Sequence, residues 1–188
     1  SQYYEESYNY KSTYTDTIGP QWINVPGASN EQGKESSLTL HNGLPFFVFR
    51  HKVGGDVSSL AYAKYVGTGG NCGYEGYYGT DPKYNFECGF VELGFSGGFT
   101  ESIYVGGSNS IDSDNSNVYV SYTEVSTSEK LRIAQYCGDG SCTGDCGYSS
   151  VGDTGEPNVE DMSWKCVYAS DHYNSGTTSP QTIVVEGE

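Results

Sequence analysis

The sequence has few basic residues, a single methionine and no long apolar segment. Lys plus Arg number 9 against 24 for Asp plus Glu, which gives a formal net charge of −15 at pH 7. Because no basic patch is present to neutralise phosphates, we expect no nucleic-acid partner. An anionic membrane surface would repel the chain. No apolar run approaches about 18 residues, so we also expect no membrane insertion.

Recognisable catalytic motifs are missing as well. The three histidines, His41, His51 and His172, are scattered, and the sequence has no Gly-x-Ser-x-Gly elbow, His-Glu-x-x-His helix or phosphate loop. A carboxylate pair for glycoside hydrolysis would have to be assembled in space. The 24 acidic residues are more typical of a solvated surface. We therefore expect that the protein is not an enzyme and carries no cofactor.

No long segment has the 3.6-residue period of an amphipathic helix. The sequence instead holds 26 glycines and 18 tyrosines, and short segments rich in Val, Ile, Tyr and Phe alternate with turns of Gly, Asn, Asp and Ser. Such segments are typical of β-strands joined by tight turns. The expected fold class is all-β.

The segment 36–88 is followed by a second copy at 109–166. Matching pieces keep their order while their separation drifts from about 71 to about 78 positions, as expected for one supersecondary unit used twice with different loops. Each copy predicts a four-stranded antiparallel meander with two different faces. The matching strand segments are 36–40, 45–49, 60–65 and 85–88 in the first copy, and 109–111, 118–122, 131–136 and 163–166 in the second.

Residues 37–40, 60–65 and 69–73, with 86–88, carry a family resemblance. They resemble the blade repeats of bacterial secreted propeller proteins of the sialidase-like (BNR-type) kind, over about two-thirds of the chain. Propellers need roughly four to eight blades, whereas this chain has two. The resemblance therefore implies two blade-like sheets, packed as a sandwich or stacked, or a piece of something larger. It does not carry sialidase activity over, because only Arg50 and Arg132 are present and the Ser-x-Asp-x-Gly-x-Thr-Trp turn is absent.

Six cysteines allow 15 disulfide pairings, and the repeat narrows them. Cys72 and Cys88 flank the long loop of the first copy, and Cys146 and Cys166 take the matching positions in the second. We predict these two disulfides, together with a small loop closed by Cys137 and Cys142. The alternative is a zinc site of Cys137, Cys142 and Cys146, which lacks a Cys-x-x-Cys pair and a nearby histidine. Disulfides imply an oxidising compartment, and a chain that starts at Ser1 without a signal peptide is expected to be a mature, secreted form.

The first 18 residues form a tyrosine-rich arm with almost no aliphatic side chain. Alternate residues of an extended chain share one face, and the arm could add as a strand to an open sheet edge or remain disordered. After the arm, residues 21–25 resemble the last strand of a blade whose sheet partners are missing. The predicted assembly residues are Tyr4, Tyr8, Tyr10, Tyr14, Ile18 and Trp22. Residues 182–186 are a second candidate for an added strand.

Two loops are candidate ligand sites. Tyr74, Tyr77 and Tyr78 lie on a glycine-rich loop, where aromatic rings either stack on sugars or cover a hydrophobic surface. The turn 112–117 gathers several oxygen ligands of the kind that calcium binds, although such turns also form without metal. The predicted calcium ligands are Asp112, Asp114, Asn115 and Asn117.

These observations predict three segments: the arm at 1–20, a first repeat with its preceding strand at 21–107, and a second repeat at 108–188. The function that we expect is an extracellular structural protein that assembles with copies of itself by strand exchange, into a filament or surface array. Two alternatives remain open: a monomeric carbohydrate-binding or adhesive module, and a fragment of a larger propeller enzyme.

Overall fold

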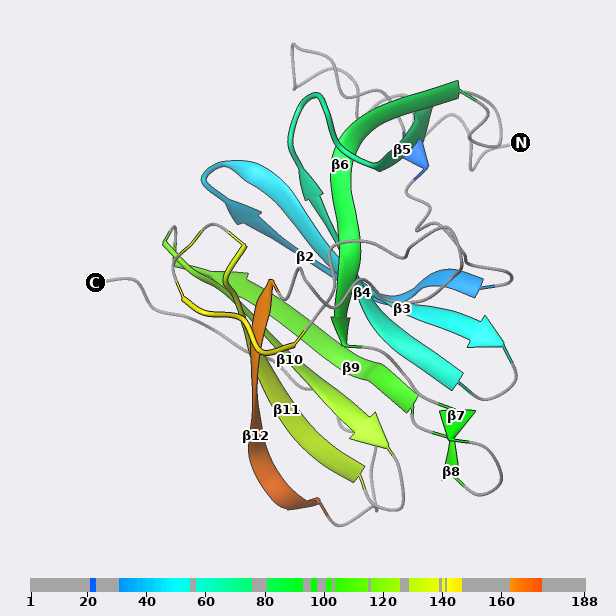
Figure 1. Cartoon of the computed structure of the whole chain (residues 1–188), viewed down its shortest axis with the longest axis vertical. Coiled ribbons are helices and arrows are strands. Elements are labelled where there is room, and N and C mark those ends of the chain that lie inside the picture. The colour runs from blue at the N-terminus through cyan, green and yellow to red at the C-terminus, as the bar shows by residue number, and fades with distance from the viewer. Residues whose placement is uncertain are drawn as a thin grey trace, which may run out of the picture.

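The computed structural model describes residues 21–22, 31–54, 57–75, 81–92, 96–97, 101–102, 104–114, 116–125, 129–138, 140, 142–146 and 163–173. Within these ranges the chain forms strands and turns, and no helix there could cross a membrane. The strands build two antiparallel sheets, which confirms the all-β prediction (Figure 1). A small separate hairpin pairs β7 (Ser96–Gly97) with β8 (Glu101–Ser102).

The first sheet contains the predicted meander and one further strand that the sequence analysis missed. Its strands are, in spatial order, β2 (Glu31–His41), β3 (Leu44–Gly54), β4 (Val57–Tyr65), β6 (Asp81–Glu92) and β5 (Cys72–Glu75). The β2–β3 hairpin turns through Asn42 and Gly43, whose φ angles are 53° and 75°. Asn-Gly is the dipeptide that this tight turn favours, because both residues tolerate positive φ.

The two-residue strand β1 (Gln21–Trp22) corrects one prediction. It was expected to be an orphan without sheet partners, but it pairs with β5 of the same chain, with Trp22 opposite Tyr74. The sequence could not show this pairing, because β5 itself was read as part of a loop. A two-residue segment has too little pattern to select a partner.

The second sheet is a four-stranded meander, as predicted. Its strands are, in spatial order, β9 (Tyr104–Ser113), β10 (Val118–Val125), β11 (Glu129–Tyr136) and β12 (Trp164–Tyr173). Val118, Val120 and Tyr122 of β10 belong to the main core, as expected from their alternation. Burial itself does not alternate along the strand, because Ser121, Thr123 and Glu124 are buried as well.

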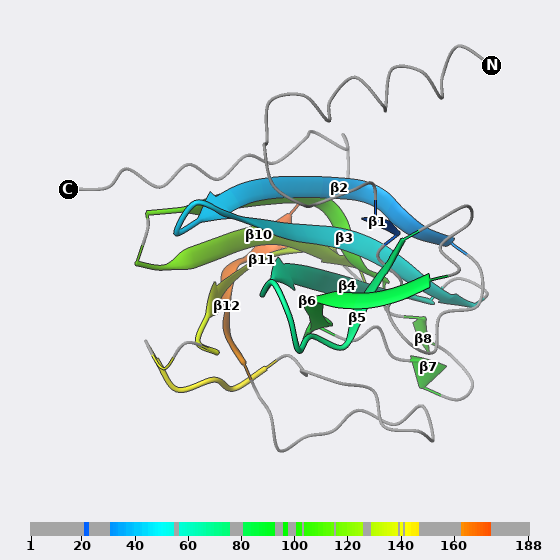
Figure 2. The same ribbon diagram turned by 90° about the horizontal axis from the view of Figure 1, so that it is seen from above.

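The two sheets stack with β2 beside β9. Figure 2 shows both sheets descending in the same order, from β2 to β6 in one and from β9 to β12 in the other. The Ile111 amide donates to Ser37 Oγ at 3.2 Å, and a single parallel bridge joins Ser58 of β4 to Tyr104 of β9. The layers therefore meet along their first strands, as well as face to face through side chains.

The main core lies between the sheets. It contains thirteen buried residues: Phe46, Val48, Leu60, Tyr62, Val91, Val105, Ile111, Val118, Val120, Tyr122, Ala134, Tyr136 and Trp164. A second cluster lies on the other face of the first sheet and contains Phe49, Ala61, Ala63, Cys72, Phe86, Cys88 and Phe90. The first sheet is thus apolar on both faces.

All three predicted disulfides are present. Cys72 pairs with Cys88, Cys137 with Cys142, and Cys146 with Cys166. The rival zinc site is ruled out, because its cysteines are consumed in disulfides and no described cysteine is free. Each disulfide loop is short, and bridges of this kind typically stabilise a fold by roughly 2–4 kcal/mol.

Candidate functional site

The outer side of β2 has no strand partner in the part of the chain that the structure describes. Among the described strands, β2 pairs only with β3. Leu40 stands opposite Pro45, which has no N–H to donate, so this is a non-hydrogen-bonded pair of the ladder. The backbone groups of Leu40, and of Leu38 two positions earlier, therefore point away from β3. Unpaired groups in such a row can pair with another strand.

Residues 36–40 carry no group that blocks a further strand, although Lys34 and two register shifts between Gln32 and Ser37 precede them in β2. Residues 36–40 read Ser-Ser-Leu-Thr-Leu and contain neither a charge nor a proline. The side chains of Leu38 and Leu40 are 55% and 51% exposed. Natural edge strands usually carry lysine, proline or a bulge to prevent pairing. The segment 36–40, which we call the β2 edge, therefore combines unpaired backbone with exposed apolar side chains.

The outer side of β12 is partly closed by contrast. Cys146 and Trp164 exchange two backbone hydrogen bonds, at 2.9 Å and 3.0 Å. The Cys166 amide donates to the Asp145 carboxylate at 2.8 Å. These bonds occupy the outward-pointing groups at the start of the strand. The β2 edge is thus the better candidate for recognition.

Four large rings hold the sheets together at one end of the interface. Phe46 and Tyr62 come from the first sheet, Tyr136 and Trp164 from the second, and none is more than 1% exposed. Their ring centroids lie 5.2–6.0 Å apart, mostly edge to face. Such pairs add about 0.5–1.5 kcal/mol each beyond the burial of their area.

A lysine closes this end of the interface. Lys64 Nζ donates to the Tyr136 hydroxyl at 2.8 Å and lies 3.1 Å from the Glu87 carboxylate. It also lies 5.0 Å from the centre of the Tyr136 ring. The lysine therefore joins the sheets by a hydrogen bond and by a cation–π contact.

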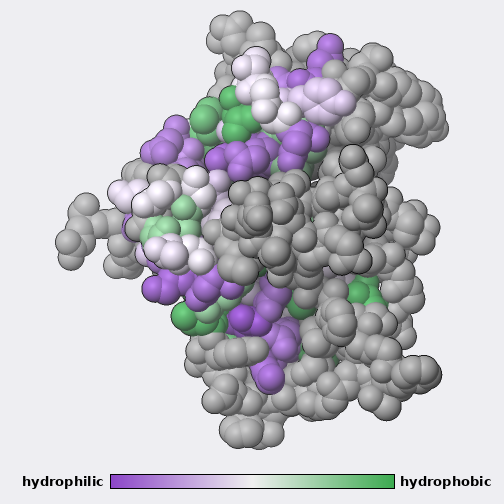
Figure 3. Space-filling model, viewed as in Figure 1, coloured by the Kyte–Doolittle hydropathy of each residue, from purple (hydrophilic) through white to green (hydrophobic). Residues whose placement is uncertain are grey.

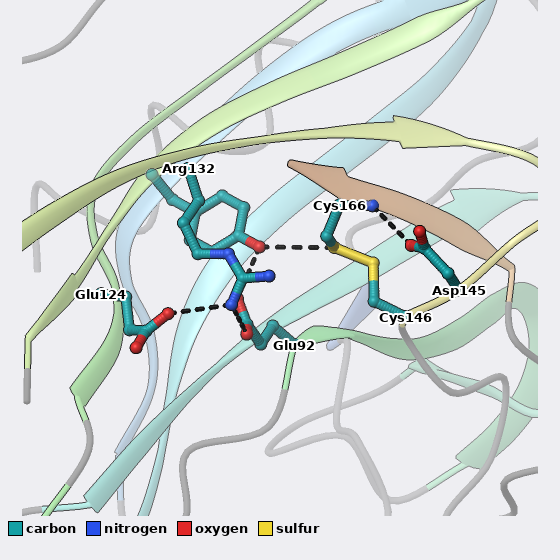
Figure 4. A network of polar contacts seen from close by, with 7 residues as sticks. Glu92, Glu124, Arg132, Asp145, Cys146 and Cys166 are labelled. Atoms are coloured by element: carbon teal, nitrogen blue, oxygen red, sulfur yellow. Dashed lines mark hydrogen bonds and ion pairs between the residues drawn. A yellow bond between two sulfur atoms is a disulfide. The ribbon is translucent and has the colours of Figure 1, made fainter. Parts of the chain in front are cut away.

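A cluster of charged groups lies farther along the interface (Figure 4). Arg132 of β11 pairs with Glu124 of β10 at 2.8 Å and with Glu92 of β6. The Tyr122 hydroxyl donates to Glu92 at 2.6 Å and lies 3.5 Å from Cys166 Sγ. The three charged side chains are only 8–18% exposed. Arg132 and Glu92 thus link the two sheets across a largely dry contact.

The charge of this cluster is not balanced, since two carboxylates share one guanidinium. Burial raises the pKa of the Glu92 carboxyl above its ordinary value, and Arg132 and the Tyr122 hydrogen bond oppose the shift. Burial also raises the pKa of Tyr122, so its hydroxyl stays protonated and donates. Shifted groups occur both at functional sites and in structural ion-pair networks. The low exposure of all members favours the structural role. The raised pKa also makes Glu92 the carboxylate that takes up a proton more readily than an ordinary one.

The turn predicted to bind calcium uses its central carboxylate for its own backbone. Asp114 Oδ1 accepts the amides of Ser116 and Asn117, at 2.9 Å and 2.6 Å. These bonds lower the pKa of Asp114. Asp112 bonds the Ser113 amide at 2.8 Å in the same way. The contacts are those of an Asx turn, and calcium binding by this turn remains a prediction. Asn115 lies outside the described residues.

One other group of potential metal ligands occurs in the described chain. Asp145, Cys146 and Cys166 lie within 4.8 Å of one another. Both cysteines belong to one disulfide, and thiolates rather than disulfides bind metal. Asp145 is the remaining ligand, and its carboxylate accepts the Cys166 amide. This group acts as a brace for the start of β12.

The predicted aromatic sites are only partly described. Trp22 and Tyr74 are brought together, because they are partners in the β1–β5 ladder. Tyr77 and Tyr78 lie outside the described residues, as do Tyr4, Tyr8, Tyr10, Tyr14 and Ile18 of the arm. The strand-exchange and glycan predictions for these residues remain predictions.

Sequence reasoning missed the buried polar groups. Glu92 and Glu124 lie 40 and 8 positions from Arg132, and no spacing rule connects the first pair. His51 was read as one of three scattered histidines, but it is 2% exposed and stacks on Phe90, with ring centroids 5.3 Å apart. Neither ring nitrogen of His51 has a hydrogen-bond partner among the described residues. Its alternation with Phe47 and Phe49, which share one face of an extended strand, was the available signal.

Comparisons with protein-family models, with curated proteins and with solved structures find no match. The function must therefore be inferred from the edges, faces and charged groups of this chain. On the side shown in Figure 3, hydrophobic residues of the described chain lie in small groups among hydrophilic ones.

Proposed function

We propose that this is an extracellular structural protein that assembles with copies of itself by strand exchange, into a filament or surface array. The β2 edge carries the proposal: its outward backbone is unpaired among the described strands, and Leu38 and Leu40 are more than half exposed. An unprotected edge of this kind accepts another strand. Strand addition to a sheet edge is also a common mode of protein recognition.

The three disulfides support the extracellular part of the proposal. They include one on each sheet, and such bridges persist in oxidising compartments. The net charge of −15 keeps copies apart at long range. Assembly then has to rely on a specific short-range contact, which the β2 edge offers.

Two segments of the sequence are candidates for the added strand. Residues 1–18 place four tyrosines on one face of an extended segment, and that face is interrupted by Glu6, Ser12 and Asp16. Residues 182–186 read Thr-Ile-Val-Val-Glu and are rich in β-branched side chains, which favour strands. Either segment would continue the sheet beyond β2 and place apolar side chains beside Leu38 and Leu40.

The test is the mass of the purified protein over a range of concentrations, measured by light scattering and negative-stain microscopy. We expect regular polymers or closed oligomers for the full chain, and a smaller species after deletion of residues 1–18. A full chain that stays at 20.4 kDa at every concentration would refute the proposal. An unchanged assembly after the deletion would point to 182–186 as the donor.

Two substitutions separate the backbone of the edge from its side chains. Leu38→Pro removes an N–H that points away from β3, so it should abolish strand addition while leaving the β2–β3 ladder intact. Leu38→Ala keeps that N–H and removes only the side chain, so it should weaken assembly less. Equal effects of the two variants would argue against hydrogen-bonded strand addition.

A further inference from the structure

The two sheets match residue by residue across their strands. In the first sheet Leu38 pairs with Phe47, Phe47 with Ala63, and Ala63 with Cys88. In the second sheet the row at the repeat-related positions consists of Ile111, Val120, Ala134 and Cys166. Each row ends on a disulfide cysteine. The sheets are thus equivalent in register as well as in strand order.

The equivalent rows lie on opposite sides of the contact between the sheets. Ile111, Val120 and Ala134 belong to the main core and face the first sheet, with Cys166 packed against them. In the first sheet, Ala63 and Cys88 belong to the second cluster, which faces away from the second sheet. Two sheets related by a twofold axis would bury the same row in both. Here the sheets are stacked in the same sense. The face that the second sheet buries against the first is therefore equivalent to the face that the first sheet turns outward.

Contacts between the sheets support the same arrangement. His41 Nδ1 lies 3.1 Å from Ser113 Oγ, and these two residues are 72 positions apart in the sequence. Lys64 donates to the Tyr136 hydroxyl, and this pair is also separated by 72 positions. The Ile111 amide reaches Ser37 across 74 positions. These separations fall inside the range of about 71–78 that relates the two copies. Near-equivalent positions therefore lie side by side, as stacking in one sense requires.

Same-sense stacking leaves one outer face on each sheet. The two outer faces are different from each other, and each is equivalent to the inner face of the other sheet. We call the outer face of the first sheet the head; it carries the row of Leu38 and Phe47. We call the outer face of the second sheet the tail; it carries Tyr119, Gln135 and Lys165. The tail is equivalent to the face of the first sheet that packs inside the molecule, where Phe46, Lys64 and Glu87 form the matching row.

The aromatic contact inside the molecule shows how a tail would fit a head. Phe46 packs against Tyr136 and Trp164, whose own centroids lie 5.2 Å apart at 67°. The head carries the same pair at equivalent positions, Tyr65 and Phe86, at 5.3 Å and 72°. Tyr119 is the equivalent of Phe46 on the tail. Phe86 is 3% exposed and packs edge-on against Phe47, so Tyr65 is the accessible member of this pair.

The accessible part of the head lies on the β2 side. Ile111 is 6% exposed because the first sheet covers it, whereas its equivalent, Leu38, is 55% exposed. Leu40 beside it is 51% exposed, and Tyr65 is partly exposed. Ala63 and Cys88, in the middle of the head, are already buried. The apolar side chains that lack a covering sheet are thus those next to the hairpin.

We propose that the tail of one copy packs on the head of the next, with Tyr119 seated beside Tyr65 and over Leu40 and Leu38. This inference rests on the proposed self-assembly and specifies its geometry. The contact is heterologous, so it leaves a free head and a free tail after every addition. Such contacts build rings or open filaments rather than twofold dimers. The partner that fits the head is therefore a second copy of this chain.

A mixing experiment tests the polarity. The head variant carries Leu38→Lys and Leu40→Lys, and the tail variant carries Tyr119→Lys. We expect each variant alone to stop at the species that strand exchange by itself allows, while an equimolar mixture gains one head-to-tail contact and forms a species of about twice that mass, because one intact head meets one intact tail. The matched control is Leu44→Lys, on the same hairpin at 44% exposure, which should assemble as wild type. Far-UV circular dichroism and thermal midpoints check that each variant folds.

The outcomes separate this inference from the proposed function. A tail variant that assembles as wild type while the head variant does not would overturn head-to-tail packing and leave strand exchange at the β2 edge in place. A head variant that by itself grows beyond the species that strand exchange allows would also overturn it, because the contact would then join like faces. Wild-type protein that stays monomeric would refute the self-assembly on which the inference rests.

Discussion

Replacing Arg132 by methionine is the sharpest test of how the two sheets are held together. Methionine fills much of the same volume but cannot neutralise a carboxylate. The substitution leaves Glu92 and Glu124, whose side chains are 18% and 8% exposed, without their shared counter-ion. Loss of one partner from a buried ion pair is strongly destabilising, because the remaining charge stays desolvated.

The expected loss follows from the burial of these groups. Breaking a buried pair typically costs about 3–5 kcal/mol. The Tyr122 hydroxyl still donates to Glu92 at 2.6 Å and offsets part of that cost. We therefore expect a loss near the lower end, about 3 kcal/mol. For a chain of 188 residues this lowers Tm by roughly 6–12 °C, at about 2–4 °C per kcal/mol.

The loss should depend on pH with a definite sign. Burial raises the pKa of Glu92 in the folded protein above its ordinary value of 4.5, and Arg132 opposes the shift. A raised folded-state pKa favours the protonated form, so its stabilising contribution is present below pH 4.5 and is lost as pH rises through the folded-state pKa. Without Arg132 the pKa rises further. The deficit of Arg132→Met should be largest at neutral pH and smaller near pH 4.5.

Calorimetry or circular-dichroism melts of both proteins at pH 7.5 and pH 4.5, with disulfides intact, provide the measurement. Arg50→Met is the matched control, because Arg50 pairs with Glu35 at 3.1 Å with side chains 27% and 41% exposed. Exposed pairs contribute about 0–1 kcal/mol. Equal losses for the two variants, or a deficit for Arg132→Met that does not shrink in acid, would refute the assigned role of the cluster.

Three further predictions concern the packing. Phe46→Ala should lower stability by about 3–5 kcal/mol, because it empties a fully buried position among three rings; a loss below about 1 kcal/mol in denaturant titrations would contradict that packing. Gly70→Ala should destabilise the fold or prevent folding, since the added Cβ would lie 2.0 Å from the Phe86 carbonyl oxygen. A Gly70→Ala variant with the yield and melting temperature of the wild type would show that this contact is wrong. Burial lowers the pKa of His51 from 6.5, so wild-type stability should fall as pH drops below 6.5. His51→Phe should remove that component, and parallel pH profiles of the two proteins would argue against it.

The strand β2 offers two surfaces for contacts with other copies: its backbone edge and the side chains on its outer face. The two surfaces support different contacts. The backbone of the β2 edge lies in the plane of the sheet and can accept a further strand. The side chains of Leu38 and Leu40 stand perpendicular to that plane and can be covered by another sheet. Strand exchange and head-to-tail stacking therefore do not compete for the same atoms. An assembly that used both would join each copy to its neighbour in two directions.

The sequence alone determined the four meander strands of each sheet and the three disulfides, but not the strand β5 or the pairing of β1. These features are local or repeated: the Asn-Gly turn sets the register of the first hairpin, and matching cysteines in two copies leave a single consistent pairing. Alternation in residues 118–122 also indicated a strand with two different faces.

Only the tertiary structure decided which face of the first sheet meets the second. Residues 46–49 of β3 read Phe-Phe-Val-Phe, so both faces are apolar and alternation cannot choose between them. The choice depends on the shape and charge of the opposing sheet. Arg132 and Glu92 illustrate this dependence, because they are 40 positions apart and come together only when the sheets stack in one sense. Contacts that depend on the mutual placement of two sheets leave no periodic signal in either strand, so the sequence could not reveal them.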